Sequence, residues 1–104
     1  MNNSFILVYI TNPSIEEAKR IAAHLLSKHL IACANIVPIN SMYYWQDKLC
    51  DEKEFVLLGK TLPSRYKEIK KEVESIHPYK TPCIMKISVS SNRKYFEWVQ
   101  QETS

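Results

Sequence analysis

The chain has 104 residues and a mass of 12.2 kDa, which predicts a single domain over residues 1–104 with a core of its own. Hydrophobic residues make up 45% of the chain and charged residues 24%, which excludes a disordered or low-complexity protein. The net charge of +3 is too small to indicate nucleic acid by itself. Gly59 is the only glycine, so the glycine-rich phosphate loops are excluded.

The cellular compartment is predicted from apolar runs and cysteines. No apolar run approaches the roughly 20 residues that span a bilayer, and residues 1–4 lack the basic residues of a signal peptide. The cysteine count is three, and an odd number without the pattern of a small disulfide scaffold indicates reduced thiols. We therefore expect a cytoplasmic protein with no membrane partner.

The N-terminal part of the chain predicts a strand followed by an amphipathic helix. Residues 5–11 are nearly all apolar, which is typical of a central strand covered on both faces. Asn12-Pro13 ends the strand, and Ser14 followed by Glu17 has the spacing of a capping box. The helix then carries apolar residues at helical spacing, namely Ala18, Ile21, Ala22, Leu25 and Leu26.

The middle of the chain predicts a long antiparallel hairpin. Residues 31–39 are rich in strand-forming residues, and Pro38 places them at the edge of a sheet. Residues 42–45 extend this strand with three aromatic side chains, and the polar segment 46–48 supplies the turn. The returning strand is predicted over residues 54–62, where the side chains are apolar on both faces.

The C-terminal part predicts a helix, a strand and a final short helix. The helix begins at Pro63-Ser64 and ends before Pro78. Residues 84–89 predict the fourth strand, and Asn92 is expected to cap the last helix. One face of the first of these helices carries the apolar residues Tyr66, Ile69, Val73 and Ile76.

The order of elements is β-α-β-β-α-β with a C-terminal helix, which predicts an α+β fold of the ferredoxin-like sandwich type. Right-handed crossovers place the first and third strands in the middle of the sheet. The second strand with its aromatic extension is longer than the first strand can cover. Either these aromatics fold back over the sheet, or they contact another subunit, as aromatic residues often do.

Five segments in series resemble the CutA family of divalent-cation tolerance proteins. They are IACANIVP (31–38), YYW with the following Lys48 (43–48), GKT (59–61), HPYKTP (77–82) and YFEWV (95–99). The resemblance covers about residues 5–100. It implies a ferredoxin-like protomer in a compact homotrimer, similar in architecture to PII signalling proteins, with long hairpins that pair between subunits. It also implies a role in the response to metal ions, copper above all, and no enzyme reaction.

The chain departs from the family pattern at three positions. After the second proline of the HPYKTP segment the family usually has glutamate, whereas this chain has Cys83. The loss of this acid counts against a metal site built on carboxylates. Glycines of the family are replaced by Ile39 and by Asp47 in the hairpin turn, where Asp tolerates a left-handed backbone.

Cys33, His77 and Cys83 are the candidate metal ligands, because thiolate and imidazole suit copper and zinc. A thiolate at residue 83 would favour Cu(I). No C-x-x-C or H-x-x-x-H spacing supplies a local chelate. Two structural alternatives stay open: Cys33 as a small buried hydrophobe in a strand, and His77 as a cation at a helix C-terminus. Cys50 is expected to be incidental and exposed.

The prolines at 78 and 82 are expected to stiffen the segment between them and to hold a pocket wall in place. We expect a pocket between subunits that binds a metal or a small ligand. Trp45, Lys60, His77 and Tyr79 are its candidate ligand-binding residues, and the three candidate metal ligands complete its lining. A PII-like trimeric small-molecule sensor is therefore the alternative function.

Other function classes that share this order of elements fit the sequence less well. Acylphosphatases need glycine and arginine in the loop after the first strand, and residues 12–14 contain neither. RNA-recognition modules need aromatic rings on the third strand, where residues 56–58 are aliphatic, so no nucleic-acid partner is expected. No catalytic residues are assigned, although Cys–His nucleophile chemistry through His77 stays open.

Overall fold

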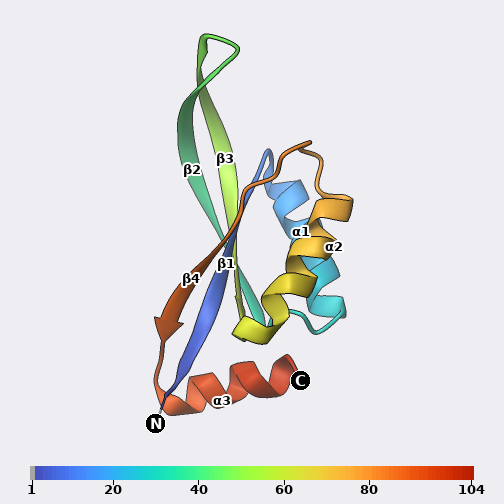
Figure 1. The fold of residues 1–104 in the computed structure, drawn as a ribbon, viewed down its shortest axis with the longest axis vertical. Helices are drawn as coiled ribbons and strands as arrows, with labels where there is room; N and C mark the ends of the chain where they lie inside the picture. Colours follow the sequence, from blue (N-terminus) through green and yellow to red (C-terminus); the bar gives the residue numbers. More distant parts are fainter. Residues whose placement is uncertain (1) are drawn as a thin grey trace.

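The computed structural model describes residues 2–104, and its elements follow the predicted order (Figure 1). The sheet has the strand order β2-β3-β1-β4, which confirms that the first and third strands are central. Within residues 2–104, none of the helices has the length and apolar character needed to cross a membrane. The elements are β1 Ser4–Asn12, α1 Ile15–Ser27, β2 Cys33–Trp45, β3 Lys48–Thr61, a 3₁₀ turn Pro63–Arg65, α2 Tyr66–Ile76, β4 Ile84–Ser90 and α3 Arg93–Glu102.

Helices α1 and α2 cover one face of the sheet (Figure 1). Side chains alternate between the faces of a strand, so β1 points Ile6, Val8 and Ile10 toward these helices. All three are at most 3% exposed. They form the main core with Ile21, Leu25, Leu30, Ile31, Leu57, Ile69 and Val73, among others.

The single glycine of the chain lies where a strand passes close to this core. A Cβ atom on Gly59 would lie 3.0 Å from Cγ2 of Ile31. Ile31 is buried, with 1% of its surface exposed, so its side chain has little space to move away. Glycine at this position therefore allows β3 and the segment before β2 to approach each other.

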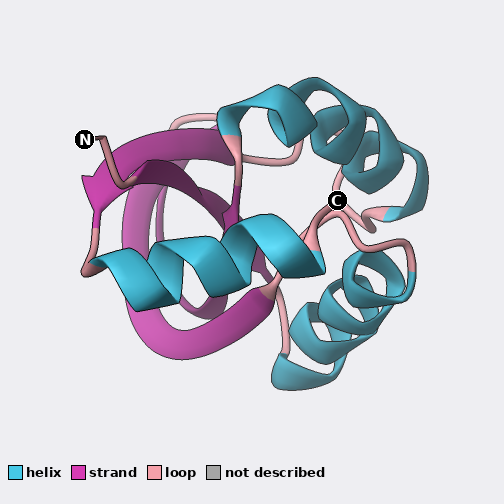
Figure 2. Cartoon of the chain, turned by 90° about the horizontal axis from the view of Figure 1, so that it is seen from below, coloured by secondary structure: helices cyan, strands magenta, loops and turns pink. Residues whose placement is uncertain are grey.

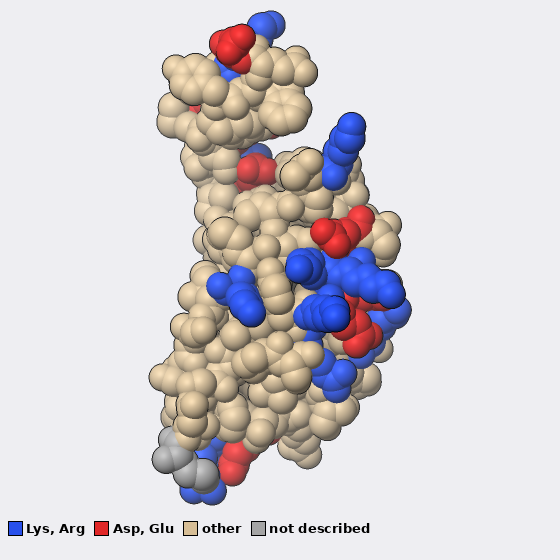
Figure 3. Space-filling view, in the orientation of Figure 1, with Lys and Arg blue, Asp and Glu red and all other residues tan. Residues whose placement is uncertain are grey.

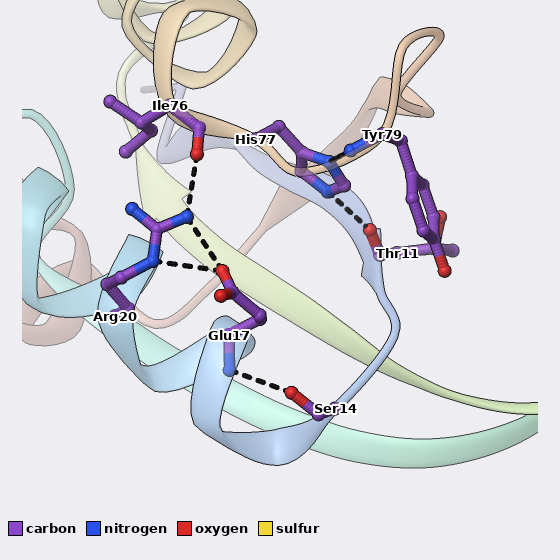
Figure 4. Close-up of polar contacts among 7 residues, drawn as sticks. All are labelled: Thr11, Ser14, Glu17, Arg20, Ile76, His77 and Tyr79. Carbon is purple, nitrogen blue, oxygen red and sulfur yellow. Dashed lines mark hydrogen bonds and ion pairs between the residues drawn. The ribbon is translucent and has the colours of Figure 1, made fainter.

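The start of α1 shows half of the predicted capping box (Figure 4). Ser14 Oγ accepts a hydrogen bond from the Glu17 backbone N–H at 3.1 Å. The Glu17 carboxylate does not return to Ser14 but accepts from the Arg20 guanidinium at 2.7 Å. Arg20 also donates to the Ile76 carbonyl at 2.6 Å, so this cluster connects the start of α1 to the end of α2.

Helix α3 lies across the lower end of the molecule and packs on the opposite face of the sheet (Figures 1 and 2). Val99 is fully buried there against Phe5 and Ala32. Asn92 occupies the predicted N-cap position, although its side chain makes no capping hydrogen bond. Only its backbone carbonyl accepts, from the Phe96 N–H at 3.2 Å. Burial of the apolar face stabilises this helix in place of a cap.

The remainder of that second sheet face is apolar and partly open. Met85 is 47% exposed, Ile87 42% and Val37 41%. Met85 and Ile87 lie opposite Tyr9 and Leu7 of β1, which share this face. We name this surface, comprising Tyr9, Val37, Leu58, Met85 and Ile87, the open face.

The hairpin extends well beyond the rest of the sheet (Figure 1). β1 pairs with β3 only from Phe55 to Thr61, whereas the β2–β3 ladder continues to the pair Trp45 and Lys48. We call residues 39–54 the arm. The prediction that the returning strand starts at residue 54 is wrong, because the polar residues before it are also paired in the ladder. The arm's exposed hydrophobic residues are Met42, Tyr43, Tyr44, Trp45 and Leu49.

The turn at the tip of the arm needs two left-handed residues. Gln46 has φ 49° and Asp47 has φ 64°. Asp47 therefore adopts the conformation expected of it, and Gln46 adopts it as well. Two residues with positive φ form the hairpin turn whose twist matches that of the strands.

A pH-dependent ion pair connects α1 and α2. The Glu72 carboxylate lies 2.7 Å from His24 Nε2 and 2.9 Å from Lys28 Nζ. The hydrogen bonds from Lys28 and then His24 lower the pKa of Glu72 below its ordinary value of 4.5. A carboxyl group whose pKa is lowered by folding stabilises the protein above its unfolded pKa and loses this effect as pH falls.

We therefore expect Glu72→Gln to lower the melting temperature, and we expect this decrease to be largest above pH 4.5. The difference from the wild type should shrink as the pH falls through the lowered pKa. Thermal unfolding followed by circular dichroism at several pH values measures this. The control is Glu74→Gln on the same helix. Glu74 is exposed and makes no ion pair with residues 2–104, so this variant should show no such pH dependence.

Candidate functional site

A cavity of ≈ 730 Å³ lies between the arm and the segment that follows α2. Figure 3 shows acidic atoms in the notch where the arm meets the body of the molecule. The arm and its base contribute Tyr43, Trp45, Cys50, Glu52 and Glu54. The segment after α2 contributes Pro78, Tyr79, Lys80, Thr81 and Cys83, and β1 contributes Thr11.

Strand geometry explains why the arm presents this set of side chains. Cys50, Glu52 and Glu54 are spaced by two residues, so they share one face of β3. Tyr43 pairs directly with Cys50 across the ladder, and Trp45 follows two residues later on the same face of β2. The arm therefore lines the cavity with two aromatic rings, two carboxylates and a thiol.

His77 fixes the other wall of the cavity (Figure 4). Its Nε2–H donates to the Thr11 carbonyl at 2.8 Å, and its Nδ1 accepts from the Tyr79 backbone N–H at 3.0 Å. The rings of His77 and Tyr79 lie 4.9 Å apart. The side chain is 9% exposed, and both ring nitrogens are engaged, which requires the neutral ring with its proton on Nε2. His77 therefore positions Tyr79 and has no ring nitrogen available for a metal in this arrangement.

Two phenol–carboxylate pairs lie side by side in the cavity. Tyr79 OH donates to Glu54 at 2.5 Å, and Tyr43 OH donates to Glu52 at 2.6 Å. Burial, followed by the neighbouring Glu54, raises the pKa of Tyr79 above its ordinary value. The hydrogen bond to Glu52 raises the pKa of Tyr43 to about 12. Both phenols therefore remain protonated donors at neutral pH.

Cys83 lies near the same carboxylate. Burial, followed by the charge of Glu54, raises the pKa of the Cys83 thiol. In a single chain this side chain is therefore a thiol at neutral pH, and a metal would have to displace its proton to bind the sulfur. Cys50, expected to be incidental, is half-buried and lines the cavity as well.

The structure divides the predicted site residues into two groups. Trp45, Tyr79 and Cys83 line the cavity, and His77 supports it. Cys33 and Lys60 instead pair with each other across β2 and β3. Lys60 also donates from Nζ to Tyr95 OH of α3 at 3.1 Å and lies 5.1 Å from the centre of that ring.

The two groups are separated along the sheet. Lys60 pairs with Leu7 of β1, whereas His77 contacts Thr11, four residues further along the same strand, or about 13 Å. Among residues 2–104 no three His, Cys, Asp or Glu side chains lie close enough to hold a metal ion. The predicted ligand set of Cys33, His77 and Cys83 therefore does not form one metal centre within a chain.

Sequence reasoning missed Tyr43, Cys50, Glu52 and Glu54. Cys50 and Glu52 lie in a polar stretch near the turn, where charged residues normally indicate a solvated loop, and Tyr43 and Glu54 were placed in strands without a role in a site. A signal was present in the alternation of Cys50, Glu52 and Glu54, which is the spacing of one strand face.

Comparison of the chain with known proteins identifies a family. The family model for CutA1 divalent ion tolerance protein matches residues 6–102. A divalent-cation tolerance protein CutA of Archaeoglobus fulgidus is 43% identical over 95 residues, covering 90% of this chain and 93% of the relative.

Solved structures show the same fold. The structure described as the periplasmic divalent cation tolerance protein CutA from Archaeoglobus fulgidus has a TM-score of 0.92 and 39% identity, covering 95% of this chain and 98% of its own. The structure of divalent ion tolerance protein CutA1 from Ehrlichia chaffeensis has a TM-score of 0.92 and 38% identity. The match covers 100% of this chain and 98% of the other.

Proposed function

The chain belongs to the CutA1 divalent ion tolerance family, and on this premise we propose that it acts in the response to metal ions as a copper-binding homotrimer. The names of its relatives refer to tolerance of divalent cations. The proposal rests on one structural observation beyond this kinship. Within one chain the predicted ligands form two separate groups, so a shared site would have to combine residues of different subunits.

Two exposed apolar surfaces support the homotrimer. The open face leaves Met85 and Ile87 nearly half exposed, and the side of the arm away from the cavity exposes Tyr44 and Leu49 by 75% and 58%. Large apolar patches of this kind mark interaction surfaces. A closed ring of three chains would cover the open faces and pair the long arms with neighbouring sheets.

Copper binding is proposed for thiols of different subunits. Cys33 and Cys83 are both free and half-buried, and thiolate is the side chain that Cu(I) prefers. Their separation within one chain means that such a site would combine Cys33 of one subunit with Cys83 of another. His77 contributes by holding the segment that carries Cys83, since its ring nitrogens are already engaged.

The test replaces both proposed ligands. We expect Cys33→Ser with Cys83→Ser to weaken Cu(I) affinity at least tenfold, measured by competition with a chromogenic chelator. Cys50→Ser is the matched control, because it removes a half-buried thiol outside the proposed pair. Unchanged copper affinity in the double variant would exclude these thiols as ligands and remove the copper proposal.

The alternative is a trimeric small-molecule sensor similar to PII proteins. The cavity favours it, since aromatic walls with a few convergent polar groups are typical of small-molecule sites. Thermal shifts separate the two functions: copper alone stabilises the first, and a small organic ligand stabilises the second.

We assign no reaction to the protein and place it in the cytoplasm. The names of the family and of the relatives refer to tolerance of divalent cations and to no reaction. Three free cysteines suit a reducing compartment.

A further inference from the structure

We propose that the cavity between the arm and the segment after α2 binds an organic ammonium cation, through the Glu54 carboxylate and the aromatic rings of Tyr43, Trp45 and Tyr79. The cavity also contains Cys83, one of the thiols proposed for copper, but the groups proposed to bind the cation are the carboxylate and the rings. It would accept a ligand that carries positive charge and apolar surface together.

Glu54 is the first observation. Its side chain lines the cavity and is only 8% exposed. Its Oε2 accepts from the Tyr79 hydroxyl, and its Oε1 makes no hydrogen bond with residues 2–104. Residues 2–104 form four ion pairs, and none of them involves Glu54. Glu54 has a hydrogen-bond donor in Tyr79 but no cationic partner among residues 2–104, so a positively charged ligand would complete the site.

The aromatic walls are the second observation. Trp45 and Tyr43 line the cavity while remaining 64% and 41% exposed, and Tyr79 lines the opposite wall. Tryptophan and tyrosine faces attract cations, and quaternary ammonium groups are recognised by such rings. The phenol hydroxyls are occupied by Glu52 and Glu54, so the rings offer mainly their apolar surface.

The charge and the ligand chemistry of the cavity exclude other occupants. The cavity is lined by two acidic side chains, Glu52 and Glu54, and by one basic side chain, the exposed Lys80. Binding of an anion is therefore disfavoured. A bare divalent ion would need several oxygen, nitrogen or sulfur ligands at short range. No such group of three is present in residues 2–104. A cation that is itself partly apolar matches both walls.

The experiment titrates the full-length protein with choline and with 3,3-dimethyl-1-butanol, which has the same shape but carbon in place of the charged nitrogen. Binding is measured by isothermal titration calorimetry and by quenching of tryptophan fluorescence. We expect choline to bind at least tenfold more tightly than the neutral alcohol. Glu54→Gln, which keeps the size and a polar tip, should remove this preference, and Trp45→Leu should weaken choline binding.

Glu74→Gln is the matched control, since it deletes one negative charge from an exposed position on α2 outside the cavity. It should leave choline binding unchanged. Equal affinity for choline and the alcohol, or a loss in Glu74→Gln as large as in Glu54→Gln, would overturn the proposal. Absence of choline binding, with Glu54→Gln instead weakening subunit assembly, would also overturn it and assign the cavity to a basic side chain of a second copy.

Discussion

Replacing Met85 and Ile87 together with arginine is expected to dissociate the protein into single chains. Both residues lie on the open face and are nearly half exposed, so the isolated chain tolerates longer polar side chains there. In a trimer that buries this face, six additional positive charges would lie in one apolar interface. Unpaired and like charges there cost several kcal/mol, which corresponds to an affinity weaker by on the order of 10³-fold.

Light scattering with size-exclusion chromatography measures the result. The wild type should have the mass of three chains of 12.2 kDa, about 37 kDa, and the variant that of one chain. Ser88→Arg with Ser90→Arg is the control, because it adds the same charges to exposed positions on the other face of β4. A wild type that is monomeric at micromolar concentration, or a double arginine variant that stays trimeric, would contradict the proposed assembly.

His77→Ala is expected to lower the free energy of unfolding by about 2 kcal/mol, since two partly buried backbone groups lose their partner. These groups are the Thr11 carbonyl and the Tyr79 N–H, which His77 joins at 2.8 and 3.0 Å. The contact with the Tyr79 ring is lost as well. Urea unfolding of the metal-free protein, followed by circular dichroism, measures the change.

The comparison that decides the role of His77 is its replacement by glutamine. Glutamine supplies one donor and one acceptor near the positions of the ring nitrogens and should recover part of the lost stability. If His77 served only as a metal ligand, alanine would leave the metal-free protein nearly as stable as the wild type. That outcome would contradict the positioning role.

Much of the fold could be predicted because apolar patterning determines it directly. Residues 5–11 are apolar on both faces, and the strand they form lies in the middle of the sheet. The helical spacing of Ile69 and Val73 likewise matches their burial in α2. The excess length of the second strand over the first was also visible, and it corresponds to the arm.

The acidic side of the cavity could not be predicted, because it depends on pairing between segments that are distant in sequence. Residues 48–53 are mostly polar, and only the ladder with β2 shows that they form a strand. The meeting of Glu54 with Tyr79 depends on how His77 anchors the segment after α2. Lys60 was assigned to the same pocket, yet in the chain its ammonium group contacts Tyr95 of α3.

The arm also constrains how relatives of this protein can change in length. Because successive strand residues point to opposite sides, inserting one residue into each strand of the arm would move Tyr43 and Glu52 away from the cavity. Inserting two in each strand would make them point to the cavity side again, further from the base of the arm. Evolution could therefore lengthen or shorten this projection in steps of two residue pairs without disturbing the layer of helices at its base.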